Sequence, residues 1–186
     1  MTLKLKLARW GRTRLDDLGR GLVTRPPRPT WWGMATVVAV YSAVALGVGL
    51  ASGFLRPQDA GSVPGTLFWL LPLTAFLVPS LSEEAIFRGL LLPHPSRRVS
   101  AGDRWLAAGI GLASYVLWHP LYAALGPGHI PVWDPAFLIL VAALGICCTG
   151  LYYYTGSLWP CVVLHWATVM VWIYGFGGRN LLLPGP

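Results

Sequence analysis

The sequence of 186 residues is 55% hydrophobic and 11% charged, and it carries a formal net charge of +7. A soluble domain has about 25% charged residues, so this composition excludes an ordinary soluble globular protein. We expect an integral, multi-pass membrane protein of the all-α class, built as one bundle of about five transmembrane helices with roughly 20 residues each.

The first 30 residues form a basic, Pro-rich segment that we interpret as a cytoplasmic tail. Eight of the 14 Lys and Arg residues of the chain lie in this segment. Because a hydrophobic stretch follows directly, the basic charge favours binding to anionic membrane lipid over binding to nucleic acid. We therefore expect membrane lipid as a partner and no nucleic acid.

Residues 31–176 form the predicted transmembrane domain, and residues 177–186 form a short tail after it. Five apolar stretches in this domain have the length and composition of membrane-spanning helices. Their predicted ranges are 31–55, 66–92, 105–125, 135–155 and 158–176.

The loop charges predict the orientation of the chain. The loop between the second and third predicted spans carries Arg97, Arg98 and Arg104, whereas the two opposite loops carry a single basic residue, Arg56. The positive-inside rule therefore places the N-terminus in the cytoplasm. A bacterial inner membrane and an organelle membrane of bacterial descent both fit this orientation.

Glu83 and Glu84 are the only glutamates of the chain, and both lie inside the second predicted span. A charged side chain at membrane depth costs roughly 2.5 to 3.5 kcal/mol on insertion scales, so such residues usually have a function. Glu84 and Arg88 are four residues apart and can pair along one helix face. Glu83 then points about 100° away around the helix and is a candidate general base. The alternative is that Glu83, Glu84 and Arg88 form a purely structural ionic group.

Two histidines lie in the apolar interiors of other predicted spans, His119 in the third and His165 in the fifth. At a rise of about 1.5 Å per residue, both histidines lie at a depth similar to that of Glu83, and the three side chains can share one site. A carboxylate and two imidazoles also suit zinc. If the site binds a metal, we expect its ligands to be Glu83, His119 and His165.

Other known types of intramembrane hydrolase do not fit the sequence. It contains no HExxH pair for zinc, no GxSxG turn for a nucleophilic serine, and no Asp inside a predicted span. What remains is glutamate together with the two histidines, His119 and His165.

The order and spacing of these residues resemble the CAAX protease and bacteriocin-processing family (CPBP, or Abi) of intramembrane glutamic proteases. The first family motif, EExxxR, matches residues 83–88. The second, an aromatic residue followed four residues later by His, matches Tyr115 and His119, although Phe is commoner than Tyr at the first position. The third, His followed four residues later by Asn, matches at His165. The resemblance covers residues 66–176.

The resemblance implies an intramembrane endopeptidase whose substrate or partner is a membrane-associated protein or peptide. In this reading Glu83 and His119 activate a water molecule for attack on a peptide carbonyl. His165 helps to stabilise the resulting oxyanion, and Glu84 with Arg88 orients the site. No cofactor is required.

One position departs from the family pattern, because Val169 stands where the third motif has Asn. The valine side chain cannot donate a hydrogen bond, and the loss of one oxyanion donor lowers a rate by about 10²–10³-fold. An alternative function is therefore a catalytically weak or inactive family member that acts as a membrane scaffold or assembly factor and binds a partner helix. A proton or ion pathway is a third alternative, since intramembrane Glu and His also build relays.

Overall fold

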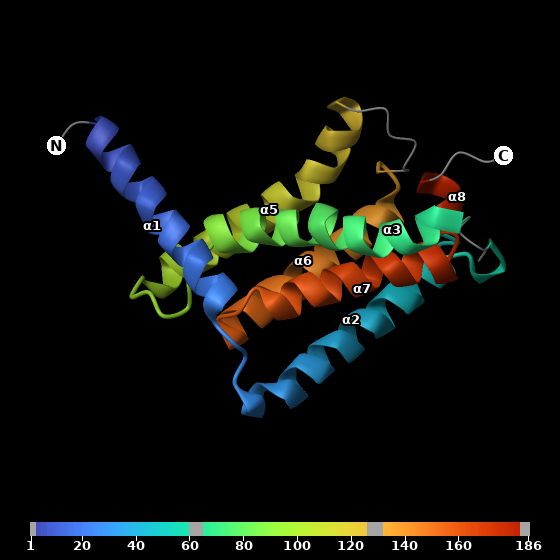
Figure 1. The fold of residues 1–186 in the computed structure, drawn as a ribbon, viewed down its shortest axis with the longest axis horizontal. Helices are drawn as coiled ribbons and strands as arrows, with labels where there is room; N and C mark the ends of the chain where they lie inside the picture. Colours follow the sequence, from blue (N-terminus) through green and yellow to red (C-terminus); the bar gives the residue numbers. More distant parts are fainter. Residues whose placement is uncertain (1–2, 60–64, 126–131, 183–186) are drawn as a thin grey trace.

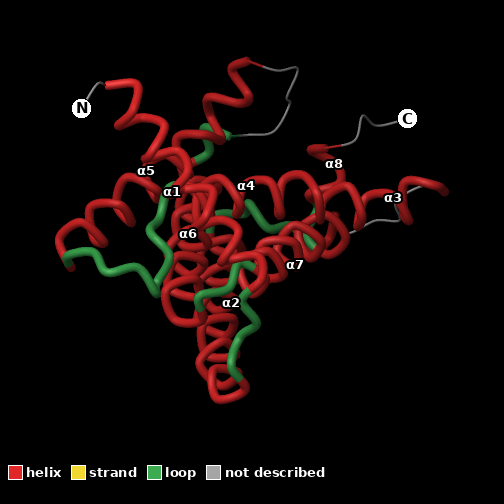
Figure 2. The backbone as a smooth tube through the Cα atoms, turned by 60° about the vertical axis from the view of Figure 1, so that its left-hand side comes forward, coloured by secondary structure: helices red, strands yellow, loops and turns green. Residues whose placement is uncertain are grey.

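The computed structural model describes residues 3–59, 65–125 and 132–182, and these residues form helices and no strand (Figure 2). The all-α class expected from the composition is confirmed. The chain begins with α1 (Leu3–Val23) and continues through the long helices α2 (Trp31–Ala51), α5 (Ala101–Leu125), α6 (Pro135–Thr155) and α7 (Trp159–Gly175) to the short α8 (Gly178–Leu182). Two 3₁₀ turns, η1 (Arg28–Thr30) and η2 (Pro57–Asp59), flank α2. Between α2 and α5, one interrupted helix consists of α3 (Gly65–Ala75), η3 (Phe76–Leu81), α4 (Ser82–Glu84) and η4 (Ala85–Leu90).

Several of these helices have the properties of membrane spans. In the described part of the chain, Arg28–Ala51, Gly65–Leu90 and Pro135–Thr155 are long and apolar enough to cross a membrane, and α7 is apolar but shorter. Large apolar side chains also lie on the outer surface, including Trp69, Leu73 and Val163. Such a surface suits contact with lipid better than contact with water. The five spans expected from the sequence stay a prediction.

Helix α6 is the most buried helix of the bundle and contacts α2, α5 and α7. Asp134 caps its N-terminus by accepting a 2.8 Å hydrogen bond from the backbone N–H of Ala136. Gly156 ends it in the left-handed conformation, with a φ of 68°, which a glycine adopts without a steric penalty. In the middle of the helix, a Cβ atom on Gly145 would collide with the side chains of Leu112 and Tyr115. The absence of a side chain at Gly145 therefore lets α5 and the glutamate-bearing segment approach α6 closely.

The helix that carries the two glutamates is broken just before them. Val78 has an extended backbone, with a φ of −138° and a ψ of 116°, and Pro79 after it has no N–H to continue the helix. The break lies inside η3, and after the short α4 that contains Glu83 and Glu84 the chain continues in the wider π-helical turns of η4. Turns of this kind are rare and occur frequently at functional sites. Figure 1 shows the interrupted helix running alongside α7, which contacts both α3 and η3.

The segment interpreted as a basic tail contains the 21-residue helix α1, which packs against η4. The backbone N–H of Leu158 donates to the carbonyl of Gly21 at 2.9 Å, and the indole N–H of Trp159 donates to the carbonyl of Leu22 at 2.8 Å. Asp17 on α1 is fully buried and pairs with Arg97 at 2.8 Å. These contacts fix the C-terminal half of α1 next to the segment that carries the glutamates.

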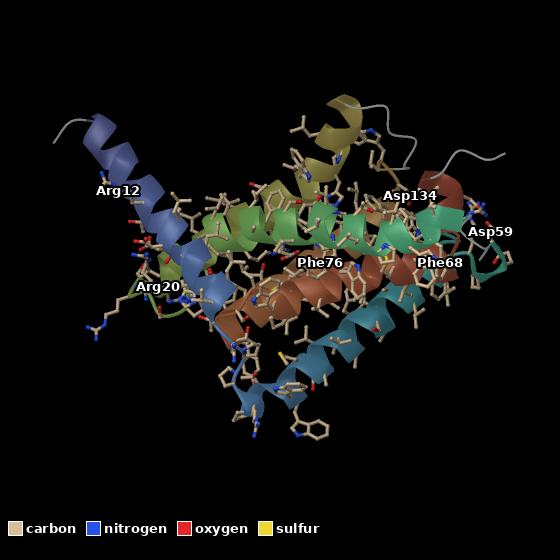
Figure 3. The ribbon with its side chains drawn as sticks, viewed as in Figure 1. Arg12, Arg20, Asp59, Phe68, Phe76 and Asp134 are labelled. Atoms are coloured by element: carbon tan, nitrogen blue, oxygen red, sulfur yellow. The ribbon has the colours of Figure 1, made fainter. Side chains whose placement is uncertain are left out.

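Charged residues separate toward opposite ends of the long axis of the molecule. Figure 3 shows Arg12 and Arg20 near the end where α1 lies, and Asp59 and Asp134 near the other end. The helices between them run roughly along this axis (Figure 1). Arg12 and Arg20 of α1 therefore lie toward one end of the apolar helices, and Asp59, which pairs with Arg56, and Asp134 lie toward the other.

Candidate active site

The five candidate residues come from three segments that meet beside α6. Glu83 and Glu84 lie on α4 and Arg88 on η4, while His119 lies on α5 and His165 on α7. They divide into a buried group around Glu84 and a second group around Glu83.

The buried group is an ionic network around the Glu84 carboxylate. Oε1 of Glu84 accepts a hydrogen bond from Nη1 of Arg88 at 3.1 Å, which confirms the ion pair expected from their spacing. Nη2 of Arg88 donates to the backbone carbonyl of Gly145 at 3.0 Å, and the guanidinium lies 4.3 Å from the ring centroid of Tyr115. The side chains of Glu84 and Arg88 are 0% and 1% exposed. Such a network joins η4, α5 and α6 and is costly to break.

His165 belongs to the buried group. Its Nδ1 lies 3.0 Å from Oε1 of Glu84, and because an ionised carboxylate can only accept, Nδ1 carries the proton and donates it. The sequence analysis grouped His165 with Glu83 by depth, but the hydrogen bond goes to Glu84. The contact of α7 with η3 brings His165 to this side of the glutamate pair.

Glu83 and His119 form the second group. Oε1 of Glu83 accepts a 3.2 Å hydrogen bond from the indole N–H of Trp118. Nδ1 of His119 lies 2.9 Å from the backbone carbonyl of Tyr115, so Nδ1 donates and Nε2 of the neutral ring is an acceptor. Nε2 lies 3.9 Å from Oε2 of Glu83, and Oε2 is buried with no hydrogen-bond partner among the described residues. Two acceptor atoms therefore face each other at a distance too long for a direct hydrogen bond.

A cavity of about 700 Å³ opens beside this second group. Its lining includes Glu83, His119 and His165, and most of the remaining lining residues are apolar side chains of α2, α3, α6 and α7. Glu84 and Arg88 do not line it. The arrangement gives one carboxylate access to a cavity that could hold an extended peptide, while the other carboxylate is held behind it.

The zinc site considered from the sequence stays a prediction. Among the described residues, Glu84, Cys148 and Cys161 form a group of three whose ligand atoms all lie within 4.8 Å of one another, whereas Glu83, His119 and His165 do not form such a group. The ligand atom Oε1 of Glu84 already pairs with the Arg88 cation. The buried Arg88 guanidinium repels a metal cation at this distance, so Glu84, Cys148 and Cys161 form a poor metal site.

Two neighbours of the site carry contacts that the sequence analysis did not identify. Trp118 holds Glu83, and the Tyr115 carbonyl sets the tautomer of His119. Trp118 directly precedes His119 in the sequence, but its orientation toward Glu83 depends on how α5 packs against the glutamate-bearing segment. Tyr115 is four residues before His119, which is the spacing at which a helical carbonyl lies beneath a following side chain.

A family model described as type II CAAX prenyl endopeptidase Rce1-like matches residues 64–171 of the chain. This range is more than half of the sequence, and it contains all five candidate residues, whereas α1 and α2 lie outside it. No curated protein and no solved structure matches the chain.

Proposed function

The chain belongs to the type II CAAX prenyl endopeptidase Rce1-like family, and from this premise we propose that it is an intramembrane endopeptidase that hydrolyses a peptide bond of a membrane-associated substrate. Its apolar helices agree with an integral membrane protein. The family match supports the reaction class. The single observation that supports the mechanism is the pair of facing acceptors, Oε2 of Glu83 and Nε2 of His119.

A water molecule that donates one hydrogen bond to each of these two atoms is the proposed nucleophile. A distance of 3.9 Å suits two acceptors bridged by one water. Glu83 takes the proton of the water as its oxygen attacks the carbonyl carbon, and His119 holds the water in place. The proton then passes from Glu83 to the nitrogen of the leaving amine as the C–N bond breaks.

The buried group positions the rest of the site in this proposal. Glu84 holds His165 by Nδ1, so the opposite ring nitrogen, Nε2, is available to the reaction. A ring that carries a proton on both nitrogens donates Nε2–H to the oxyanion. Arg88 pairs with Glu84 and holds it against α6 through the carbonyl of Gly145.

We further propose that the chain crosses the membrane several times with its N-terminus in the cytoplasm. The position of Arg12 and Arg20 at one end of the apolar helices, opposite the end where Asp134 lies, supports this orientation (Figure 3). The exposed basic residues of α1, such as Arg12 and Arg20, would then contact anionic lipid headgroups.

The proposal is tested with the full chain reconstituted in liposomes. The probes are an internally quenched farnesylated peptide ending in a CAAX sequence and a panel of unprenylated membrane-anchored peptides, with the products identified by mass spectrometry. We expect cleavage by the wild type and at least about 10²-fold slower cleavage by Glu83→Gln, which retains the shape of the side chain but cannot take a proton. Asp59→Asn is the matched control, because this partly exposed carboxylate lies at the end of η2, away from the site. Absence of wild-type cleavage, or full cleavage by Glu83→Gln, overturns the proposal.

Val169 favours the second candidate function, a scaffold that binds a partner helix in the same cavity. Its side chain lines the cavity, so an apolar group occupies the position where the family resemblance places an Asn. In this case Glu83→Gln would leave co-purification with a membrane protein partner and complementation of a deletion strain unchanged. Loss of complementation in Glu83→Gln with retained insertion would contradict the scaffold function.

A further inference from the structure

Two positions of the site differ from the family pattern, and both line the same cavity. Tyr115 stands where Phe is commoner, and Val169 stands where Asn is expected. The first change adds a hydroxyl to α5, and the second removes a hydrogen-bond donor from α7. The two changes together move a donor from one wall of the cavity to another.

The ring of Tyr115 lies between the two histidines. Its centroid is 5.1 Å from that of His119 and 6.1 Å from that of His165, and both pairs of rings meet nearly at right angles. The Arg88 guanidinium packs against the face of the same ring. A side chain held on three sides has little freedom to move, so its hydroxyl has a defined position.

The hydroxyl of Tyr115 has no hydrogen-bond partner among the described residues, although the residue is 0% exposed. Buried hydroxyl groups are almost always paired, and an unpaired one requires an explanation. A donor that is unpaired in the resting enzyme, on a residue that lines the cavity, can pair with a group that exists only during the reaction.

On the basis of the proposed endopeptidase function, we propose that Tyr115 is a catalytic residue whose hydroxyl donates a hydrogen bond to the oxyanion of the tetrahedral intermediate. Tyr115 would thus supply the donor that the family pattern has as Asn at the position of Val169. Water adds to the carbonyl carbon while Glu83 takes its proton, and the electron pair of the C=O bond moves onto the oxygen. Tyr115 donates to this negative oxygen without transferring its proton. When the C=O bond re-forms, the C–N bond breaks and Glu83 protonates the leaving nitrogen.

The test compares wild type, Tyr115→Phe, Val169→Asn and the double variant in the liposome assay, using whichever peptide of the panel the wild type cleaves. We expect Tyr115→Phe to lower kcat by about 10²–10³-fold, the usual effect of removing one oxyanion donor, with KM nearly unchanged. Val169→Asn places a donor on α7 and should restore most of the lost kcat in the double variant.

Tyr152→Phe is the matched control for the loss of a hydroxyl. Its hydroxyl is also buried without a partner in the described residues, but Tyr152 packs in the α6 core and does not line the cavity. We expect its kcat to equal that of the wild type. Thermal unfolding in detergent checks that every variant is folded.

The outcomes separate this inference from the proposed function. If Glu83→Gln is inactive while Tyr115→Phe keeps wild-type kcat, or loses activity only through KM, the inference is overturned and the proposed function stands. A loss of kcat without restoration by Val169→Asn also overturns the exchange of donors. If no peptide is cleaved by the wild type, both fall together.

Discussion

The Nδ1 atom of His165 donates a 3.0 Å hydrogen bond to Oε1 of Glu84, not to Glu83. This contact divides two adjacent glutamates into different tasks. Oε2 of each glutamate has no hydrogen-bond partner among the described residues. Glu84 is held at Oε1 by His165 and Arg88 and does not line the cavity, whereas Glu83 lines it. This difference supports the structural role proposed for Glu84 and the chemical role proposed for Glu83.

The structural role of Glu84 predicts a large loss of stability when it is truncated. Glu84→Ala leaves the Arg88 charge buried without its partner, which costs about 3–5 kcal/mol in comparable buried pairs. Replacing both partners, as in Glu84→Met with Arg88→Met, removes the unpaired charge and should cost less than Glu84→Ala alone. Thermal or denaturant unfolding in detergent measures the differences.

Glu83→Gln is the control for this prediction, since its carboxylate makes no ion pair with Arg88 in the structure. Its free energy of unfolding should stay within about 1 kcal/mol of the wild-type value, because the substitution does not break the ion pair of Glu84 and Arg88. A Glu84→Ala protein as stable as Glu83→Gln would show that the buried ion pair contributes nothing.

The position of His119 predicts a loss of activity without a loss of stability. His119→Ala removes the group proposed to hold the water, and we expect kcat to fall by about 10²–10⁴-fold. His94→Ala is the control, because this buried histidine lies 3.0 Å from the carbonyl of Gly156 and serves the helix end, away from the cavity. It should lower the unfolding temperature more than it lowers kcat. The opposite pattern in the two variants would contradict the roles assigned to them.

The sequence predicted the positions of the long helices well, because hydropathy reports them directly. The predicted span 135–155 coincides with α6, and 158–176 differs from α7 by one residue at each end. The break at Val78 was not predicted, since Pro79 lies in an apolar run that reads as continuous. The sequence predicted a basic tail where α1 lies, because the many basic residues of this segment give no sign that it packs against η4.

The site residues were identified from their types and spacing, but their partners were not. The pairing of Glu84 with Arg88 is local and follows from helix geometry. The choice of His165 between two neighbouring glutamates depends on how α7 packs against η3, which is a long-range contact. The unpaired hydroxyl of Tyr115 likewise depends on long-range packing, because its ring contacts Arg88 on η4 and His165 on α7.

The unpaired hydroxyl predicts that Tyr115→Phe is as stable as the wild type or more stable. A buried polar group without a partner costs about 1–3 kcal/mol, and Phe removes it while keeping the ring between the histidines. The unfolding temperature in detergent, without substrate, measures this effect. A clear decrease would mean that the hydroxyl is already bonded in the resting protein.

The packing of α1 predicts that the N-terminal helix supports activity from outside the family-matched range. Asp17→Ala removes the buried partner of Arg97, so α1 should detach more often and trypsin should cut near Arg14 and Arg20 faster. Because α1 packs on η4, which carries Arg88, cleavage of the peptide probe should slow as well.

Asp16→Ala is the matched control, since it removes an exposed carboxylate from the same turn of α1. It should leave both the trypsin digestion rate and peptide cleavage at wild-type values. Equal digestion of the Asp16→Ala and Asp17→Ala proteins would show that the buried ion pair does not hold α1. Faster digestion of Asp17→Ala with unchanged peptide cleavage would show that α1 is anchored there but does not support the site. Only the combination of faster digestion and slower cleavage connects the N-terminal helix to the geometry of Arg88 and, through it, of Glu84.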